Sequence, residues 1–246
     1  MPCLLVDMGN THLRWSDPQG LARGRVGSLA TAALQEQLPS HWSGLPRPRA
    51  VWVSSVAGEG ANRTLQRWVE AHWQVPVHFP RAYRRQLGVS NGYREPGQLG
   101  VDRWLALIGA RALSHGPLIV VDCGTATTLD GMDERGQHLG GLILLGTGLM
   151  EESLLEQTAI TRPDENGVPG LFATGTAAAI RSGALLATIG LIEKMYHVLL
   201  EQSTKEVTCF LTGGAADAVQ RGLRIPLRRE PNLVLQGLAL VADVAP

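Results

Sequence analysis

The sequence predicts an α/β protein made of two related halves, each with a mixed sheet. Two segments, Leu4–Thr11 and Ile119–Thr128, are alike: each is an apolar run that ends in an aspartate and turns at a glycine followed by asparagine or threonine. Such runs predict strands buried on both faces, and the glycine lets the backbone turn back tightly. Hydroxyl and backbone N–H groups in these turns suit phosphate oxygens, so we expect a duplicated nucleotide-binding half-domain.

The first half begins with one of these strands and its returning arm. Helical spacing of apolar residues and the loop composition of residues 88–100 place the later elements. The elements expected here are strands over 4–7, 12–15, 50–56 and 75–79, and helices over 31–38, 62–73 and from 101 onward.

The second half follows a glycine- and proline-containing break at 114–117, so we expect half-domains at residues 1–114 and 115–246. Strand patterns alternate with helical ones, which favours α/β layers. The elements expected here are strands over 118–122, 127–132 and 207–212, a glycine-rich segment over 139–148, helices over 149–156, 176–201 and 233–241, and a polar loop over 162–170.

The composition is that of an ordinary globular protein, with 44% hydrophobic and 18% charged residues. Basic and acidic residues balance at 22 each without a basic run, so we expect no nucleic-acid partner and no membrane surface. Cys3, Cys123 and Cys209 have no metal-ligand spacing, which favours reduced, buried thiols in a cytoplasmic protein. No signal peptide is evident, and the most apolar window, Gly140–Met150, is too short to span a bilayer.

Four ordered motifs resemble those of the type III pantothenate kinases. Their D-x-G-N-T-x-x-K/R start is similar to Asp7–Arg14, their G-x-D-R to Gly100–Arg103, and their D-x-G-T-A-T-T-x-D to Asp122–Asp130, followed by the pair Gly140–Gly141. Leu211–Ala216 resembles the adenosine motif of the wider acetate and sugar kinase, heat-shock chaperone and actin superfamily. The resemblance covers nearly the whole chain. It implies the actin-like ATPase fold, with two ribonuclease H-like half-domains and the nucleotide between them.

The residues for phosphate binding have two interpretations. Asp7 can form an Asx turn, or it can lie near Mg-ATP, because Mg²⁺ binds through one or two carboxylates plus phosphates. Arg14, where many family members have lysine, can be a surface charge or can offset negative charge on the transferring phosphoryl group. The resemblance implies an ATP site made of Asp7, Met8, Gly9, Asn10, Thr11, His12, Leu13, Arg14 and Thr125.

The residues for the phosphoryl acceptor centre on the start of the helix at 101. Asp102 can simply complement the helix dipole, but the same place suits a base that accepts a hydroxyl proton. Arg103 can be a solvated helix charge or a planar partner for a substrate carboxylate. The resemblance implies that Asp102 is catalytic and that pantothenate is bound by Tyr93, Gly100, Val101, Asp102, Arg103 and Thr176.

Other positions either follow or depart from the family pattern. Thr176 begins the long helix, where capping is the common role, and Gly175 replaces the family's asparagine before it. Leu145 replaces a proline, which affects loop stiffness more than chemistry. The resemblance implies a monovalent cation, potassium or ammonium, beside Asp122 as the metal residue. Asp130 is either a supporting carboxylate or a hairpin residue, and the histidines form no catalytic or metal-ligand spacing.

The resemblance therefore implies ATP-dependent phosphorylation of pantothenate to 4′-phosphopantothenate, the first step of coenzyme A biosynthesis, with Mg²⁺ and a monovalent cation. It also implies a homodimer, and the small residues Gly183, Ala187 and Gly190 on one face of the long helix are a candidate contact. Two alternatives stay open: a non-catalytic transcriptional accessory factor that keeps the nucleotide clamp, and a sugar kinase of the same superfamily. The intact Asp7 and Asp102 argue against the first, and the G-x-D-R helix start argues against the second.

Overall fold

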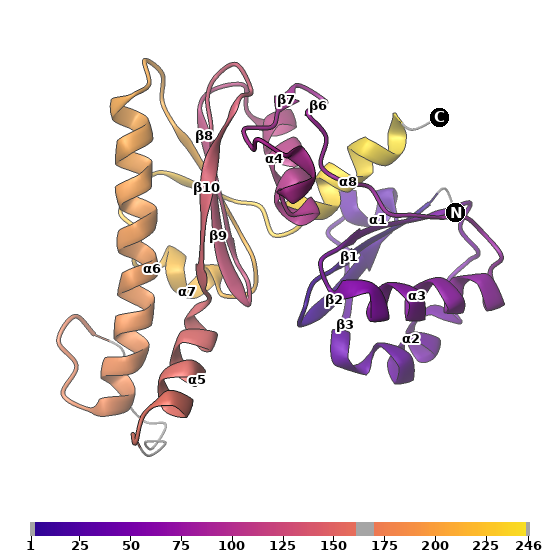
Figure 1. Cartoon of the computed structure of the whole chain (residues 1–246), viewed down its shortest axis with the longest axis horizontal. Coiled ribbons are helices and arrows are strands. Elements are labelled where there is room, and N and C mark those ends of the chain that lie inside the picture. The colour runs from indigo at the N-terminus through magenta and orange to yellow at the C-terminus, as the bar shows by residue number, and fades with distance from the viewer. Residues whose placement is uncertain (1–2, 161–169, 245–246) are drawn as a thin grey trace. The chain divides into compact units, whose positions relative to one another are not determined.

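A computed structural model describes residues 3–160 and 170–244 of the chain. Its contacts divide it into two compact units, Met1–Leu113 with Asn232–Pro246 and Ser114–Pro231 (Figure 1). We call these the first and second units and describe each by itself. The division into half-domains 1–114 and 115–246 stays a prediction, while the contacts themselves group the last helix with the first unit.

The first unit contains a mixed five-stranded sheet in the order β3-β2-β1-β4-β5. The first three strands are antiparallel neighbours, whereas β4 and β5 run parallel to β1. Its strands are β1 (Leu4–Met8), β2 (His12–Ser16), β3 (Gly27–Ala30), β4 (Val51–Ser55) and β5 (Val77–His78), with a separate hairpin of β6 (Arg85–Gln86) and β7 (Val89–Ser90). Its helices are α1 (Pro18–Ala22), η1 (Thr31–Ala33), α2 (Leu34–Trp42), α3 (Gly58–His72), η2 (Pro96–Gln98), α4 (Val101–Leu113) and α8 (Leu233–Asp243).

Different helices pack on the two faces of this sheet. Side chains of alternating strand positions pack with α2 and α3 in one core, which includes a stack of Trp42 on Trp73 with ring centroids 5.3 Å apart. On the other face, α4 and α8 cross closely. A β-carbon added at Gly109 would lie 2.6 Å from the Leu233 carbonyl oxygen, so a glycine is required at this crossing. The crossing fixes α4, which carries Asp102 and Arg103.

The second unit repeats the sheet of the first. Its order is β10-β9-β8-β11-β12, again with three antiparallel strands followed by two that run parallel to the central one. The predicted duplication and the predicted mixed sheets are therefore confirmed. Its elements are β8 (Leu118–Cys123), β9 (Ala126–Met132), β10 (His138–Leu145), α5 (Thr147–Gln157), α6 (Thr176–Glu201), β11 (Thr208–Thr212), α7 (Ala216–Gln220) and β12 (Leu227–Arg229).

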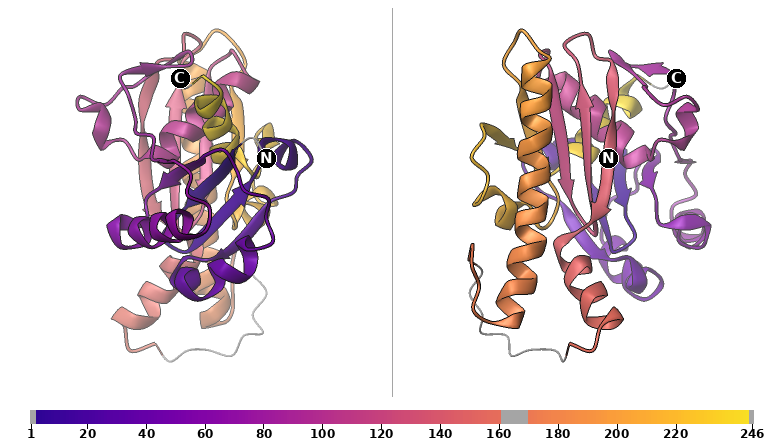
Figure 2. Two further views of the ribbon diagram at one scale, coloured as in Figure 1. Left: turned by 90° about the vertical axis from the view of Figure 1, so that its right-hand side faces the viewer. Right: turned by 60° about the vertical axis from the view of Figure 1, so that its left-hand side comes forward.

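The long helix α6 packs one side on this sheet, along the strands (Figure 2). Ile189, Ile192 and Tyr196 of α6 are buried against Ile119 and Val121 of β8. Among the described residues α6 is the one helix long and apolar enough to cross a membrane, judged by length and composition alone. Part of that apolar character belongs to side chains that α6 buries in the core. Core helices of globular proteins can have the same length and composition as membrane-spanning helices.

The structure differs from the sequence predictions in several elements. The glycine-rich segment at 139–148 is largely the edge strand β10, with an irregular register between His138 and Gly140. The strand expected over 75–79 has only two paired residues. The sequence did not predict α1, β3, the β6–β7 hairpin, α7 or β12, which are short and lack a long periodic pattern. The polar loop expected over 162–170 lies, except for its last residue, outside the described residues.

Candidate functional site

The first phosphate loop is the turn between β1 and β2. The backbone N–H of Gly9 donates to the carbonyl of His12 at 2.9 Å and closes the turn. Asn10, Thr11 and His12 are exposed at its tip. A tight turn that presents polar side chains and backbone groups in this way suits phosphate oxygens.

Thr31, at the start of η1, restrains this loop. Its hydroxyl donates to the Gly9 carbonyl at 2.8 Å, and its backbone N–H donates to the Thr11 carbonyl at 2.8 Å. Thr31 was not predicted from the sequence, because no local pattern signals a contact 22 positions away. The loop is therefore shaped partly from outside its own motif.

Arg14, Asp7 and Ser54 form a line across three neighbouring strands, which we call the first row. Asp7 of β1 is paired with Arg14 of β2 and with Ser54 of β4. Paired residues project from the same face of a sheet, so a guanidinium group neighbours the Asp7 carboxylate. Ser54 is fully buried, and its Oγ has no hydrogen-bond partner among the described residues.

The other expected ATP-site residues of this segment differ in burial. Met8 and Leu13 are fully buried in the core of the first unit, so only their backbone groups could face a nucleotide. Asp7 and Arg14 are half-buried on the opposite face. This alternation is what the period of a strand requires.

The acceptor residues lie together where α4 begins. Asp102 is in the first turn of α4, and its Oδ1 accepts the backbone N–H of Arg103 at 2.8 Å. A β-carbon added at Gly100 would come 2.6 Å from this carboxylate oxygen. The glycine of the G-x-D-R motif thus leaves the space that the carboxylate occupies. Val101 begins the helix and is half-buried.

Arg103 and Tyr93 contact each other beside this helix start. The Arg103 side chain is buried, its Nη1 donates to the Tyr93 hydroxyl at 3.0 Å, and its guanidinium carbon lies 5.8 Å from the centre of the ring. A solvated surface charge is therefore excluded for Arg103. Five of the predicted acceptor residues, Tyr93, Gly100, Val101, Asp102 and Arg103, are brought together by the first unit.

The second phosphate loop lies between β8 and β9 and has the same plan. The Gly124 N–H donates to the Ala126 carbonyl at 3.1 Å, and Thr125 is exposed at the tip. The Thr125 carbonyl accepts the N–H of Gly146 at 2.9 Å. A β-carbon at Gly146 would lie 2.6 Å from that carbonyl, so the residue before α5 packs directly on the loop.

Thr128, Asp122 and Thr212 form the corresponding second row. Asp122 of β8 is paired with Thr128 of β9 and with Thr212 of β11. All three residues carry oxygen groups, and they project from one face of the sheet. Asp122 and Thr128 are half-buried, whereas Thr212 is buried. This row has no cationic member.

The adenosine motif lies directly beside Asp122. Gly213 has φ of +90°, which glycine adopts readily, and a β-carbon there would collide with the Asp122 carboxylate and the Cys123 backbone. The Ala215 N–H donates to the Cys123 carbonyl at 2.9 Å. Arg229 of β12 donates to the carbonyls of Leu211 and Gly213 at 3.1 and 3.2 Å. Arg229 was not predicted from the sequence, because it supports the motif from a neighbouring strand.

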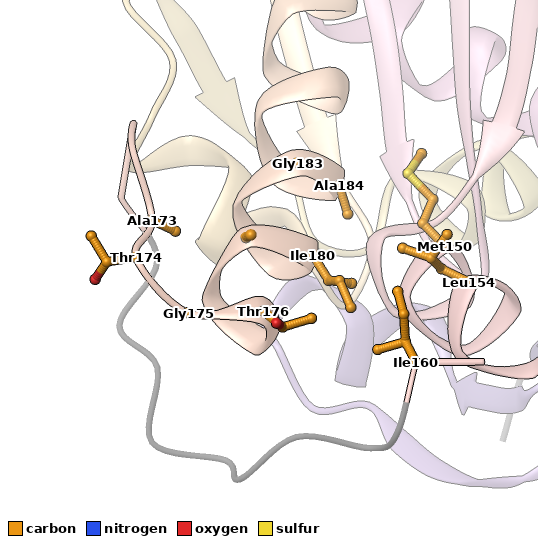
Figure 3. Close-up of a pocket in the computed structure, with 11 residues that line it drawn as sticks. Met150, Leu154, Ile160, Ala173, Thr174, Gly175, Thr176, Ile180, Gly183 and Ala184 are labelled. Atoms are coloured by element: carbon orange, nitrogen blue, oxygen red, sulfur yellow. The ribbon is translucent and has the colours of Figure 1, made fainter. Parts of the chain in front are cut away.

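Thr176 lies in the second unit, at the first position of α6, and lines an apolar pocket of about 780 Å³ (Figure 3). Gly175 occupies the N-cap position, and no side chain caps this end among the described residues. Met150 and Leu154 of α5 and Ile180 of α6 line the pocket, and Leu154 faces Ile180 across it (Figure 3). Thr174 and Thr176 are thus the polar side chains that line a mainly hydrophobic space.

Asp130 is the hairpin residue that pairs with a histidine. Its Oδ1 lies 2.8 Å from Nε2 of His138, and both side chains are buried. The pair joins β9 to β10 across the irregular register at the start of β10. The sequence analysis assigned the histidines no role, because His138 belongs to no ligand or triad spacing.

Burial favours the protonated form of two thiols in the sheet of the second unit, Cys123 on β8 and Cys209 on β11. Burial, with the Asp122 charge as a smaller cause, raises the pKa of Cys123 to about 12. Burial alone raises the pKa of Cys209 to about 12. A thiolate nucleophile is therefore not available at Cys123, although it follows the loop aspartate directly.

Two sheets of one order, each with a polar turn after its first strand, define a nucleotide-binding protein of the actin-like ATPase fold. The chain belongs to the type III pantothenate kinase family, whose model matches residues 3–198. A type III pantothenate kinase of Burkholderia thailandensis is 40% identical over 258 residues, which cover 99% of this chain and 98% of the relative. That of Paraburkholderia xenovorans is 38% identical over 261 residues, covering 98% and 95%.

Solved structures show the same fold at low sequence identity. A candidate 2-dehydro-3-deoxygalactonokinase from Sinorhizobium meliloti has a TM-score of 0.60 at 15% identity and covers 98% of each chain. A candidate Baf family transcriptional activator from Campylobacter jejuni has a TM-score of 0.58 at 18% identity, covering 98% of this chain and 97% of that chain. At these identities the likeness concerns the fold alone.

Proposed function

We propose that this chain transfers the γ-phosphoryl group of ATP to the 4′-hydroxyl of pantothenate, giving 4′-phosphopantothenate and ADP. The observation that carries the proposal is the acceptor group in the first unit. Asp102 lies at a helix start with a glycine that makes room for its carboxylate, and Arg103 is buried against Tyr93. A base and a guanidinium group side by side suit an acceptor with a hydroxyl and a carboxylate.

In this proposal Asp102 accepts the proton of the pantothenate 4′-hydroxyl. At the same time the hydroxyl oxygen forms the new bond to the γ-phosphorus, and the bond between this phosphorus and the ADP oxygen breaks. Pantothenate binding is assigned to Tyr93, Gly100, Val101 and Arg103 of the first unit and to Thr176 of the second. Phosphoryl transfer depends mostly on positioning and electrostatics, so it needs no covalent nucleophile.

The ATP site is assigned to the two phosphate loops, with Asp7, Gly9–Arg14 and Thr125 as its polar members and the backbone of Met8 and Leu13. Mg²⁺ supplies charge compensation on the phosphates when bound. The first row fits a hydrated Mg²⁺, because this ion keeps several waters and the buried Ser54 hydroxyl has no partner among the described residues. Arg14, beside Asp7, is the candidate guanidinium for the transferring group.

A monovalent cation, K⁺ or NH₄⁺, is assigned to Asp122. The support is the chemistry of the second row, in which a carboxylate stands between two threonines. One negative charge surrounded by neutral oxygens suits a weakly hydrated monovalent ion. The first row, which already contains an arginine, does not offer this environment.

We also propose that the protein is a cytoplasmic homodimer that binds neither nucleic acid nor a membrane. The second unit exposes large apolar side chains on β10, α5 and α6, and apolar side chains that gather on a surface mark interaction sites. Its members are Leu139, Leu142, Ile143, Leu145, Leu149, Leu154, Leu186 and Leu200. Gly183, Ala187 and Gly190 are exposed on the same helix, where they allow close approach of a second copy.

The dimer is tested by sedimentation equilibrium of the Ile143→Lys variant, since Ile143 is 64% exposed on β10. We expect this variant to be monomeric, whereas the matched control Leu113→Lys, at an exposed position of the first unit, stays dimeric. A wild-type monomer, or a dimer unaffected by Ile143→Lys, would contradict the proposal that this surface is the dimer interface.

The activity is tested by ADP release with pantothenate compared with a panel of sugars, at saturating Mg-ATP and K⁺. We expect turnover with pantothenate and background rates with sugars. Turnover with a sugar would favour the sugar-kinase alternative. Nucleotide binding without any turnover would favour the accessory-factor alternative.

A further inference from the structure

All three polar groups of Tyr93 are held by hydrogen bonds within the first unit. Its N–H donates to Oδ1 of Asn91 at 2.9 Å, and its hydroxyl accepts Nη1 of Arg103 at 3.0 Å. Its carbonyl accepts Nη1 of Arg84 at 3.0 Å. The residue lies in the irregular segment between β7 and η2, so these contacts, and no helix or strand, determine where its ring lies.

Arg84 makes two of these loop contacts with one side chain. Besides the Tyr93 carbonyl, its Nη2 donates to the Arg94 carbonyl at 2.7 Å. Two successive carbonyls are thus bound by the planar fork of one guanidinium, a geometry that a lysine ammonium cannot reproduce.

The backbone of Arg84 is held by residues at the far end of the hairpin that follows it. The Arg84 carbonyl accepts the Asn91 N–H at 2.9 Å, and the Asn91 side chain donates to the Pro96 carbonyl at 3.2 Å. The hairpin is fixed to α4 in turn, because Nε1 of Trp104 donates to Oε1 of Gln86 at 3.1 Å. A continuous set of contacts therefore runs from the helix that carries Asp102, through the hairpin and Arg84, to the backbone of Tyr93.

We infer that Arg84 is a positioning residue for the phosphoryl acceptor: it holds the Tyr93 loop in the conformation that places the ring against Arg103, and so sets the affinity for the carboxylate-bearing substrate. Arg84 itself is exposed and need not touch the substrate. The inference rests on the proposed function, because it takes Tyr93 and Arg103 as the acceptor site.

The neighbouring arginines provide matched controls. Arg85 is adjacent, equally charged and exposed, but the structure shows no hydrogen bond or ion pair of its side chain within the described part of the chain. Arg81 contacts the ring of Tyr83 instead of the loop backbone. Loss of charge in this basic segment can therefore be separated from loss of the contact with Tyr93.

The test measures steady-state kinetics of wild type, Arg84→Gln, Arg84→Lys and Arg85→Gln with both substrates. We expect Arg84→Gln to raise the KM for pantothenate by roughly tenfold, because it loses two charge-assisted hydrogen bonds. Both bonds are exposed to solvent, which weakens them. The KM for ATP and kcat should change little. Arg84→Lys should fall between wild type and Arg84→Gln, and Arg85→Gln should match wild type.

A second comparison distinguishes positioning from general loss of structure. In a Tyr93→Ala background the further change Arg84→Gln should raise the KM for pantothenate no further, because residues that act as a unit are not additive. Additive effects, or equal effects of Arg84→Gln and Arg85→Gln, would overturn the inference. If Arg84→Gln does not fold, the same criteria apply to Arg84→Lys. A wild-type protein inactive on pantothenate would instead overturn the proposed function.

Discussion

The two phosphate loops share one backbone plan but carry different charges. In the first row Asp7 stands between Arg14 and Ser54, and in the second row Asp122 stands between two threonines. The first carboxylate therefore has a fixed cation as its neighbour, while the second has only oxygen groups in its row. Duplication of a sheet has thus produced two rows of different electrostatics, and only the second places a carboxylate between two neutral hydroxyl groups.

The residues that surround the two phosphate loops also differ between the units. The first unit adds the acceptor residues on α4, with Tyr93 held beside Arg103. The second unit adds the adenosine motif, with Gly213 against Asp122. We infer that the first unit provides the acceptor chemistry and the first phosphate loop, while the second provides the second phosphate loop, the adenosine motif and the monovalent-cation site.

The largest expected effect concerns the base of the first unit. Asp102→Asn keeps the size and the hydrogen bond to the Arg103 N–H but removes the basicity, and a positioned base is typically worth about 100- to 10,000-fold in rate. We expect kcat to fall by that factor while the thermal midpoint stays close to wild type. A variant that keeps most of its kcat would contradict the role of Asp102.

A smaller effect tests whether acceptor and nucleotide binding are separate. Arg103→Lys keeps the charge but loses the planar fork, and one charge-assisted hydrogen bond is worth about 1.5–3 kcal/mol, or roughly 10- to 150-fold in binding. The KM for pantothenate should rise by a factor in this range, with the KM for ATP nearly unchanged. An equal loss of ATP affinity would mean that Arg103 serves the phosphates.

The candidate residues that could be predicted from the sequence lie in local motifs at strand ends and helix starts. Residues that contact these motifs from distant parts of the chain could not be predicted. Asp7, Asp102 and Asp122 could be selected as candidates because each belongs to a local motif at the end of a strand or the start of a helix. Thr31, Arg84 and Arg229 were not assigned to the site, because each supports a motif from a distant part of the chain. The helix α8 itself was expected over 233–241, but its packing on α4 was not predicted, because it is a long-range contact.

The smallest effect concerns Cys123, which follows Asp122 where Met8 follows Asp7. Burial raises its pKa from 9.0 to about 12, so the folded state binds this proton more tightly than the unfolded state. The associated stability is fully present below pH 9.0 and is lost as the pH rises toward about 12. Chemical denaturation across this range should show a smaller fall in unfolding free energy for Cys123→Ala than for wild type. Identical pH profiles would contradict the burial of this thiol.

The difference between the two rows is tested most directly by the potassium concentration that gives half-maximal activity. Thr212→Val removes one oxygen of the second row without changing its shape, and should raise this concentration roughly three- to tenfold. Ser54→Ala, the matched change in the first row, should leave it unchanged, and wild type should be nearly inactive in sodium alone. Equal activity in sodium and potassium, or equal shifts from both variants, would contradict the assignment of the monovalent cation to the second unit.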